Sequence, residues 1–288
     1  SDAKDELHAR ELREEAVAKA RAYAAAGDPV LFIGGLDHEH DLEGRDRTDM
    51  RLPYGQDELI EALLEAAPNT ILAFVAGSPI EMPWADKAKA IVWNWYAGCE
   101  SGAALAEVLF GRVNPSGHLP ETFPIALTDE PAHRIGTFGL EGHVDYAEDI
   151  YVGYRYFETF DPDYEKVNYP FGYGLSYTDF KISEVTVDFD GDALTGTANV
   201  SATVTNTGDM AGKEVVQVYF SAPQAGEGEA KMSKPAKELA AFDKTDLLEP
   251  GESETLEMSF AISDMSSYDD IGETGHKSAY VMEAGDYD

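Results

Sequence analysis

Hydrophobic and polar positions in the first 110 residues alternate between short apolar runs and longer segments with helical spacing or composition. The apolar runs predict strands of a parallel sheet, the first of them buried on both faces. They cover residues 29–34, 70–75 and 90–95. The helical segments cover residues 4–26, 56–67 and 101–110. Strands that alternate with helices indicate a parallel α/β domain, which we assign to residues 1–124.

This domain starts on a helix and has few strands for an open sheet. We therefore expect that its first strands lie outside these 288 residues. Residues 125–175 are rich in Gly, Pro and aromatic side chains, and no helical or alternating period is sustained there. Because disordered linkers are poor in aromatics, this stretch predicts an ordered connecting segment packed against both of its neighbours.

From Ser176 to Asp288 apolar residues recur at every second position, with turn residues between the runs. The runs are 180–189, 194–205, 214–220, 237–243, 254–262 and 278–282. In the second run, Val200, Ala202 and Val204 share one face. Short strands with frequent turns predict an antiparallel β-sandwich over residues 176–288, and we expect it to lack its last strand. The fold class is therefore α/β plus all-β.

The charge balance narrows the range of partners. There are 55 Asp and Glu residues against 21 Lys and Arg residues, a formal net charge of -34. Such a surface repels phosphate backbones and anionic lipids, so we expect no nucleic-acid and no membrane partner. Two interpretations of the acidity stay open. One is a solvated coat suited to solubility or high salt, and the other is calcium binding in loops.

Cysteine usage and the N-terminal residues bear on the compartment. The single cysteine, Cys99, excludes an internal disulfide framework and a cysteine-based zinc site. The first 26 residues are charged and alanine-rich, unlike a signal peptide, and no apolar run approaches the ~18 residues that span a bilayer. These features predict a cytoplasmic protein.

The charged loop after the first strand is the best candidate site. Ligands of open parallel sheets gather at the carboxyl ends of the strands, and this loop leaves one. Glu43 precedes Gly44, which lets the backbone turn sharply and present a carboxyl group for general acid catalysis. The alternative is an exposed loop held by an Asp46–Arg47 or a Glu43–Arg45 charge pair.

Other side chains have weaker claims to a function. His38 and His40 could suggest a metal, but two such residues on an acidic loop are more often solvated, so we expect no metal site. Trp84, Trp93 and Trp95 suggest a surface on which a sugar ring could stack. Core burial is the simpler interpretation for at least one of Trp93 and Trp95. Glu100 follows the third strand and is a candidate for lining the same cleft as Glu43.

The order of short motifs resembles the C-terminal half of the family-three glycoside hydrolases, a group that includes β-glucosidases and β-xylosidases. In the first part these motifs cover residues 42–47, 52–53, 56–60, 68–70, 77–79, 83–86, 95–98, 108–111, 113–117, 119–120, 122–124, 150–156 and 169–177. Residues 204–208, 214–218, 235–239 and 248–251 look like the fibronectin-III-like domain of that family. The resemblance runs over nearly the whole chain.

The resemblance implies hydrolysis of terminal β-linked sugars with retention of configuration, by two carboxyl groups ~5–5.5 Å apart. The acid/base residue of the family falls on Glu43. Asp46 and Arg47 match the same motif and would fix the loop. Arg45 stands where an aromatic residue is usual, which puts the sugar preference in doubt. No cofactor is implied.

The nucleophile of the family is an Asp on a separate (β/α)8 barrel, and neither that barrel nor its motif is present in these residues. We therefore expect no glycosidase activity from this chain alone. Its expected partners are a β-linked glucoside and the missing barrel domain, with homo-oligomerisation left open. Two alternatives remain. One is a non-catalytic carbohydrate-binding or scaffold module, and the other is an acidic salt-adapted or calcium-binding structural protein.

Overall fold

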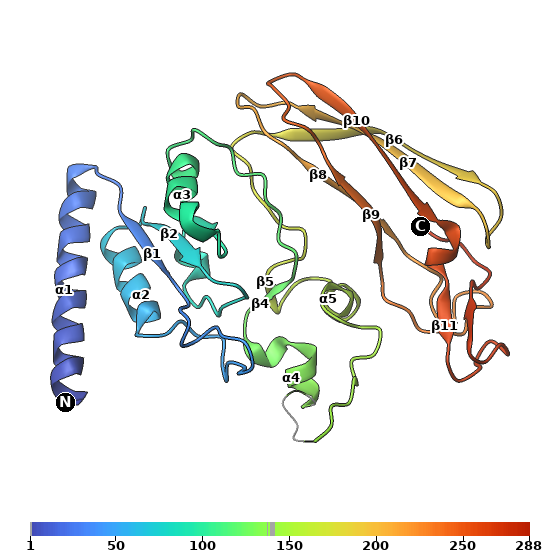
Figure 1. The fold of residues 1–288 in the computed structure, drawn as a ribbon, viewed down its shortest axis with the longest axis horizontal. Helices are drawn as coiled ribbons and strands as arrows, with labels where there is room; N and C mark the ends of the chain where they lie inside the picture. Colours follow the sequence, from blue (N-terminus) through green and yellow to red (C-terminus); the bar gives the residue numbers. More distant parts are fainter. Residues whose placement is uncertain (1, 137, 139–141) are drawn as a thin grey trace. The chain divides into compact units, whose positions relative to one another are not determined.

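A computed structural model describes residues 2–136, 138 and 142–288. The chain forms two compact units that interleave along the sequence (Figure 1). The first unit contains the described residues up to Ala106 together with 123–130 and 166–168. The second contains the described residues of 107–122, 131–165 and 169–288. The boundaries expected after residues 124 and 175 stay a prediction.

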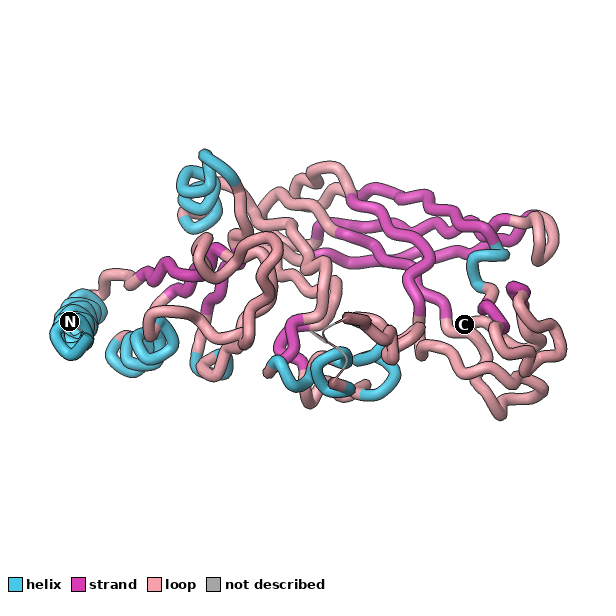
Figure 2. Tube along the Cα trace, turned by 60° about the horizontal axis from the view of Figure 1, so that its bottom comes forward, coloured by secondary structure: helices cyan, strands magenta, loops and turns pink. Residues whose placement is uncertain are grey.

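Two helices of the first unit lie side by side in both views (Figures 1 and 2). The first helix, α1 (Asp2–Ala26), consists of strong helix formers and ends where Gly27 adopts a φ of 85°. The second, α2 (Gln56–Ala66), buries Ile60, Leu63 and Leu64 on one face. No helix in the described part of the chain combines the length and the apolar character that a membrane span requires.

The first unit contains a parallel sheet in the order β1–β2–β3. Its strands are β1 (Leu31–Gly35), β2 (Ile71–Val75) and β3 (Ala90–Trp93). The central strand is the most buried, and the ring of Phe74 stacks on that of Trp84 at 5.3 Å. Trp84 is fully buried, and its Nε1 donates to Asp57 at 2.9 Å. The predicted parallel α/β arrangement is confirmed.

Two strand predictions were wrong in detail. The first strand was expected to be buried on both faces, but Leu31 is 43% exposed and Ile33 58% exposed. Leu31 and Ile33 share one face of β1, and within the described residues only the opposite face, which carries Phe32, is covered. The third strand was expected to reach Trp95, but it ends at Trp93 because the backbone turns into a left-handed conformation at Trp95, with φ 46°. The turn η2 (Gly98–Glu100) and helix α3 (Ser101–Leu109) follow.

Residues 123–175 contain short elements that the sequence did not predict. The strands β4 (Phe123–Pro124) and β5 (Val167–Tyr169) pair, and two further helices are α4 (Pro131–Ile135) and α5 (Tyr154–Phe160). Three-residue 3₁₀ turns, η1 (Ala85–Lys87) and η3 (Leu127–Asp129), lie in the first unit. Elements of two to seven residues are too short to produce a visible hydrophobic period.

Within the second unit, two side-chain hydrogen bonds join helix α5 to residues 236–239. The hydroxyl of Tyr154 accepts the backbone N–H of Leu239 at 2.8 Å, and the hydroxyl of Thr159 accepts that of Ala236 at 2.9 Å. Phe157 on the same helix is only 1% exposed. These contacts show how the aromatic-rich stretch is ordered.

The second unit is built from antiparallel strands, which Figure 2 shows as its longest extended segments. Its strands are β6 (Phe180–Asp190), β7 (Thr197–Asn206), β8 (Val215–Phe220), β9 (Glu238–Lys244), β10 (Ser253–Ala261), β11 (Ser267–Asp269) and β12 (Ala279–Val281). They form the sheets β10–β7–β6, β8–β9 and β11–β12. The turn η4 (Ile262–Met265) follows β10.

The core of the second unit lies on one face of β7, as the alternation predicted. Val200, Ala202 and Val204 are buried there, together with Val216 of β8 and Leu256 of β10. The predicted combination of an α/β domain and an antiparallel β domain is confirmed. The short strand β11, which pairs with β12, was not predicted.

Candidate active site

The candidate loop leaves the carboxyl end of β1 through a glycine that the packing requires. Gly35 has φ 139°, and a Cβ atom there would lie 2.0 Å from the carbonyl oxygen of Val75. The side chain of Gln56, at the start of α2, accepts the N–H of Gly35 and donates to its carbonyl oxygen, both at 2.9 Å. One amide side chain therefore joins the two ends of the β1–α2 loop (residues 36–55).

Glu43 lies at the corner of a tight turn in this loop. Leu42 and Arg45 form an isolated antiparallel bridge, so Glu43 and Gly44 make the corner between them. Gly44 has φ 79°, a conformation that glycine adopts without strain. The guanidinium Nη2 of Arg45 donates to the carbonyl oxygen of Glu39 at 2.6 Å and closes the loop behind the turn. The side chain of Glu43 is exposed.

Each arm of this turn is held by the loop that follows a neighbouring strand. After the turn, Nη2 of Arg47 donates to Oγ of Ser78 at 2.9 Å and to the carbonyl oxygen of Pro79 at 2.8 Å. Before the turn, the hydroxyl of Tyr96 donates to Oδ2 of Asp41 at 2.6 Å. Ser78 follows β2 and Tyr96 follows β3, so segments after both of these strands contact the loop that carries Glu43.

The base of the loop carries a second carboxylate–phenol pair. The hydroxyl of Tyr54 donates to Oδ2 of Asp37 at 2.6 Å, and Nδ1 of His40 lies 2.8 Å from Oδ1. These two hydrogen bonds hold the pKa of Asp37 well below its ordinary value. The same hydrogen bond to Asp37 raises the pKa of Tyr54 to about 12, so the phenol stays a donor at neutral pH.

Tyr96 and Asp41 approach each other beside Gly77, where there is little room for a Cβ atom. A Cβ atom at Gly77 would lie 2.7 Å from the ring of Tyr96 and 2.9 Å from Oδ2 of Asp41. Burial and then the hydrogen bond to Asp41 raise the pKa of Tyr96 to about 12. This phenol is therefore also protonated, and a donor, at neutral pH.

Four of the five residues singled out in the sequence lie close together along the chain, in the β1–α2 loop. They are Glu43, Arg45, Asp46 and Arg47, and both Asp46 and Glu43 are exposed. Glu100 is exposed too, in the η2 turn between β3 and α3. Within the described residues, neither charge pair of the alternative interpretation forms, because Arg45 and Arg47 donate to other groups. The roles of these five residues stay predictions.

Sequence reasoning missed the two carboxylate–phenol pairs. Tyr96 follows the third strand, so the rule that placed the loop at the carboxyl edge of the sheet could have included it. Nothing in the spacing pointed to Tyr54, which comes 17 residues after Asp37 and has φ 63°. His40 belongs to the Asp37 cluster. No group of three or more His, Cys, Asp or Glu side chains suited to a metal ion occurs in the described part of the chain.

The tryptophans contribute mainly to packing. Trp84 has no exposed surface, so it belongs to the core and is not a sugar platform. Trp93 and Trp95 are half-buried, with their rings edge to face at 5.9 Å. The ring of Trp93 also meets that of Phe123 at 4.8 Å. Core burial, expected for at least one of these two residues, thus accounts for part of each side chain.

Comparisons with known proteins agree with the resemblance seen in the motifs. Residues 3–177 match the family model described as the glycosyl hydrolase family 3 C-terminal domain, and residues 214–288 match that of the fibronectin type III-like domain. A β-glucosidase of Kluyveromyces marxianus is 42% identical over 278 residues, which are 95% of this chain and 30% of that protein. A probable β-glucosidase I of Aspergillus clavatus is 42% identical over 85% of this chain and 29% of that protein.

Solved structures show the same relationship in three dimensions. The crystal structure of the K. marxianus β-glucosidase in complex with glucose superimposes with a TM-score of 0.82, covering 95% of this chain and 31% of that one. A β-glucosidase of Bifidobacterium adolescentis gives 0.83 at 38% identity, covering 96% and 38%. This chain thus spans about a third of the length of such relatives. It belongs to the glycosyl hydrolase family 3 C-terminal domain family and carries a fibronectin type III-like domain after that region.

Proposed function

We propose that this chain supplies the general acid/base, Glu43, to a retaining, exo-acting β-glycosidase of the β-glucosidase type. The observation that carries the proposal is the placement of Glu43. It is exposed at the corner of an anchored turn on the carboxyl edge of a parallel sheet, where ligands of such sheets bind. The relatives named β-glucosidases support the substrate class, a terminal β-linked glucoside.

The proposed reaction has two steps. In the first, a carboxylate nucleophile on a (β/α)8 barrel attacks the anomeric carbon while the carboxyl group of Glu43 gives its proton to the leaving oxygen. In the second, the carboxylate of Glu43 takes a proton from water as the water oxygen displaces the nucleophile from the sugar. The sugar is released with its original configuration, and both carboxyl groups return to their starting states.

The exposure of Glu43 fits a site that a second domain completes. A general acid works best when its surroundings exclude water from the carboxyl group. In this chain by itself Glu43 is exposed, so the substrate and the barrel would supply that covering. Arg47 would hold the turn through Ser78 and Pro79. Arg45, Asp46 and Glu100 are proposed to bind the sugar or to position the loop.

The proposal predicts that the 288 residues alone do not turn over glycosides, because they lack the nucleophile. An assay of the purified chain with an activated aryl β-glucoside tests this, and the full-length enzyme is the positive control. Turnover by the isolated chain at a rate comparable to that of the full-length enzyme would contradict the proposal that the nucleophile lies on a separate domain.

The role of Glu43 is tested in the full-length enzyme with Glu43→Gln. Glucosides with poor leaving groups need protonation, so their turnover should fall by about 10²–10⁴-fold. Activated aryl glucosides leave without a proton and should form the glycosyl-enzyme at a nearly unchanged rate. The matched control is Glu61→Gln, an exposed glutamate on α2 that should change neither substrate class.

A second experiment uses Glu43→Ala with an activated aryl glucoside and azide. Azide is a nucleophile that needs no general base, so it should restore turnover and give a glucosyl azide of retained configuration. If Glu43→Gln affected neither substrate class and azide had no effect on Glu43→Ala, the non-catalytic carbohydrate-binding alternative would be favoured.

A further inference from the structure

The turn that carries Glu43 is fixed by different contacts on its two sides. On the side after the turn, Arg47 makes two hydrogen bonds to the loop that follows β2. On the side before it, Asp41 accepts one short hydrogen bond, from Tyr96. Asp41 lies two residues before Glu43. The hydrogen bond from Tyr96 joins this arm to the segment that follows β3, whereas the bonds from the Asp41 N–H to Asp37 and from Arg45 to Glu39 stay inside the β1–α2 loop.

Three features of the chain hold Tyr96 in position for this bond. The left-handed backbone conformation of Trp95, with φ 46°, redirects the chain just after β3. The ring of Trp95 packs edge to face on that of Trp93, which resists rotation of the segment. Gly77 leaves the space in which the Tyr96 ring and the Asp41 carboxylate meet. Tyr96 therefore lies on the short segment that follows β3, whereas Asp41 belongs to the β1–α2 loop.

We propose that Tyr96 is a positioning residue for the acid/base turn, acting through its hydrogen bond to Asp41 and without contact with the substrate. The proposal rests on the assignment of Glu43 as the acid/base. Proton transfer requires the carboxyl group within hydrogen-bond reach of the leaving oxygen, and small misplacements of a reacting group reduce rates steeply. An arm released from Tyr96 would let the Glu43 carboxyl group sample positions from which it cannot protonate.

The test compares Tyr96→Phe with wild type in the full-length enzyme, because this variant removes one hydroxyl and keeps the ring that packs near Gly77. We expect kcat for a glucoside with a poor leaving group to fall about tenfold. This is smaller than the largest losses that misplacement of a reacting group can cause. KM should stay within about twofold, and the rate at which an activated aryl glucoside forms the glycosyl-enzyme should change little, because that step needs no proton from Glu43. A general loss of structure would lower both substrate classes together.

Substitutions of the acceptor give an independent arm of the test. Asp41→Ala removes the acceptor and should reproduce the leaving-group dependence of Tyr96→Phe. Asp41→Asn keeps an acceptor oxygen of the same shape and should restore most of the activity on the poor leaving group. The matched control is Tyr23→Phe on α1, whose hydroxyl makes no hydrogen bond within the described residues and which should behave as wild type. If Tyr96→Phe does not fold, the comparison of Asp41→Ala with Asp41→Asn still tests the proposal.

The outcomes separate this inference from the function on which it rests. If Glu43→Gln shows leaving-group dependence and Tyr96→Phe and Asp41→Ala do not, the positioning role is wrong and the acid/base assignment stands. If Glu43→Gln itself shows no such dependence, both fall. Equal losses on both substrate classes in Tyr96→Phe and Asp41→Ala would also overturn the positioning role, since they would indicate a purely structural contact.

Discussion

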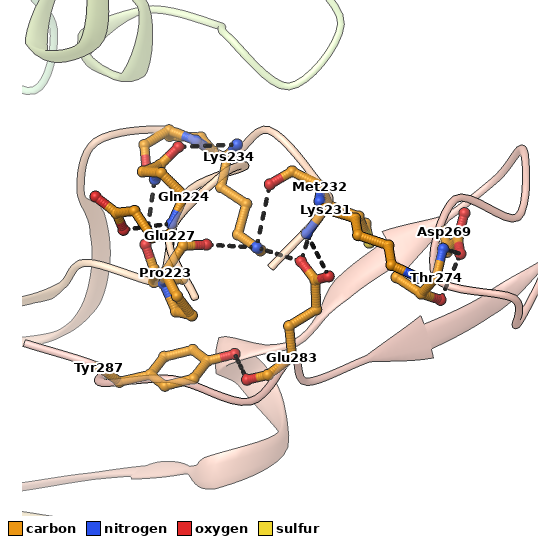
Figure 3. Close-up of polar contacts among 12 residues, drawn as sticks. Pro223, Gln224, Glu227, Lys231, Met232, Lys234, Asp269, Thr274, Glu283 and Tyr287 are labelled. Atoms are coloured by element: carbon orange, nitrogen blue, oxygen red, sulfur yellow. Dashed lines mark hydrogen bonds and ion pairs between the residues drawn. The ribbon is translucent and has the colours of Figure 1, made fainter. Parts of the chain in front are cut away.

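The ammonium group of Lys234 lies 2.7 Å from a carboxylate oxygen of Glu283, and both side chains are almost fully buried (Figure 3). Lys234 also donates to the carbonyl oxygens of Pro223 and Met232, at 2.6 and 3.2 Å. Glu283 accepts the backbone N–H groups of Lys231 and Met232 as well, at 2.8 and 3.1 Å. A buried ion pair with its remaining hydrogen bonds satisfied ties the end of the chain to the loop after β8.

Removing one partner of this pair should destabilise the second unit strongly. Glu283→Gln leaves the charge of Lys234 buried without compensation, which costs about 3–5 kcal/mol in comparable cases. We expect the double variant Lys234→Met/Glu283→Gln to recover part of this loss, because it removes the unpaired charge. Urea unfolding of the purified chain measures both. Equal stabilities of the single variant and the wild type would contradict the structural role.

The same pair predicts a loss of stability at acid pH. Burial raises the pKa of Glu283, but the hydrogen bonds from Lys234 and the backbone outweigh it and hold the pKa below its ordinary value. A lowered pKa contributes stability above the unfolded value of about 4.3, and this contribution is lost as the pH falls through the folded value. Unfolding curves between about pH 6 and pH 3 should show a steeper decline in wild type than in Glu283→Gln.

Gly77→Ala should disturb the meeting point of Tyr96 and Asp41. The added Cβ atom would lie within 3 Å of both side chains, so one of them must move. Overpacking of this kind typically costs about 1–3 kcal/mol. The matched control is Gly102→Ala, in helix α3, where a Cβ atom meets nothing within 4 Å and should stabilise the helix slightly. Thermal unfolding of both variants and of wild type measures the change in stability. A loss in Gly77→Ala alone would show that the space between Tyr96 and Asp41 is too small for a Cβ atom.

Titration of the tyrosines should reveal the hydrogen bond from Tyr96 directly. Its pKa is raised to about 12 by burial and by Asp41, so Asp41→Asn should lower it. The raised value contributes stability below the unfolded pKa of about 10, and that stability is lost as the pH rises through about 12. Ultraviolet difference spectra of wild type, Asp41→Asn, Asp41→Ala and Tyr96→Phe measure the shift. Asp41→Asn keeps an acceptor oxygen, so an unchanged titration in Asp41→Ala is the result that would rule out the hydrogen bond.

Asp269 should determine the conformation of the loop between β11 and β12. Its carboxylate accepts the hydroxyl of Thr274 at 2.6 Å and the backbone N–H groups of Gly272, Glu273 and Thr274 at 2.6–2.9 Å (Figure 3). These bonds, that of the Thr274 hydroxyl first, lower its pKa to about 2. Asp269→Asn should make this loop more sensitive to limited proteolysis, whereas Asp270→Asn at the exposed neighbour should not.

The acid response of that loop follows from the same carboxylate. Because the folded pKa of Asp269 is depressed, its contribution to stability is present above about pH 4 and is lost as the pH falls through about 2. Proteolysis by an acid-active protease should therefore reach the wild-type loop only at the acid end of this range. Cleavage that does not depend on pH would contradict the role of Asp269.

Much of the fold was predictable because the relevant signals are local. The apolar run 71–75 forms the central strand β2, and the alternating residues Val200, Ala202 and Val204 form the buried face of β7. Both patterns depend only on the periodicity of a strand. Predictions failed where the outcome depended on neighbours. Leu31 and Ile33 are as apolar as the β2 residues, but within the described residues the face of β1 that carries them is not covered.

The candidate site was predictable in part for the same reason. Glu43 was singled out as a candidate because a strand end, an adjacent glycine and a family motif coincide in one short segment. The partners of Arg47 are 31 and 32 residues away, and that of Asp41 is 55 residues away. No spacing rule connects such positions before the strands are ordered in the sheet.

The amino-acid sequence by itself determined the two kinds of domain, the loop that carries Glu43 and the acidic surface, since periodicity, turn residues and charge are properties of neighbouring positions. Only the tertiary structure decided that Tyr96 meets Asp41 beside Gly77 and that Lys234 meets Glu283 in the second unit. Hydrogen bonds and ion pairs act over about 3 Å, so they exist only after the fold has brought distant segments together.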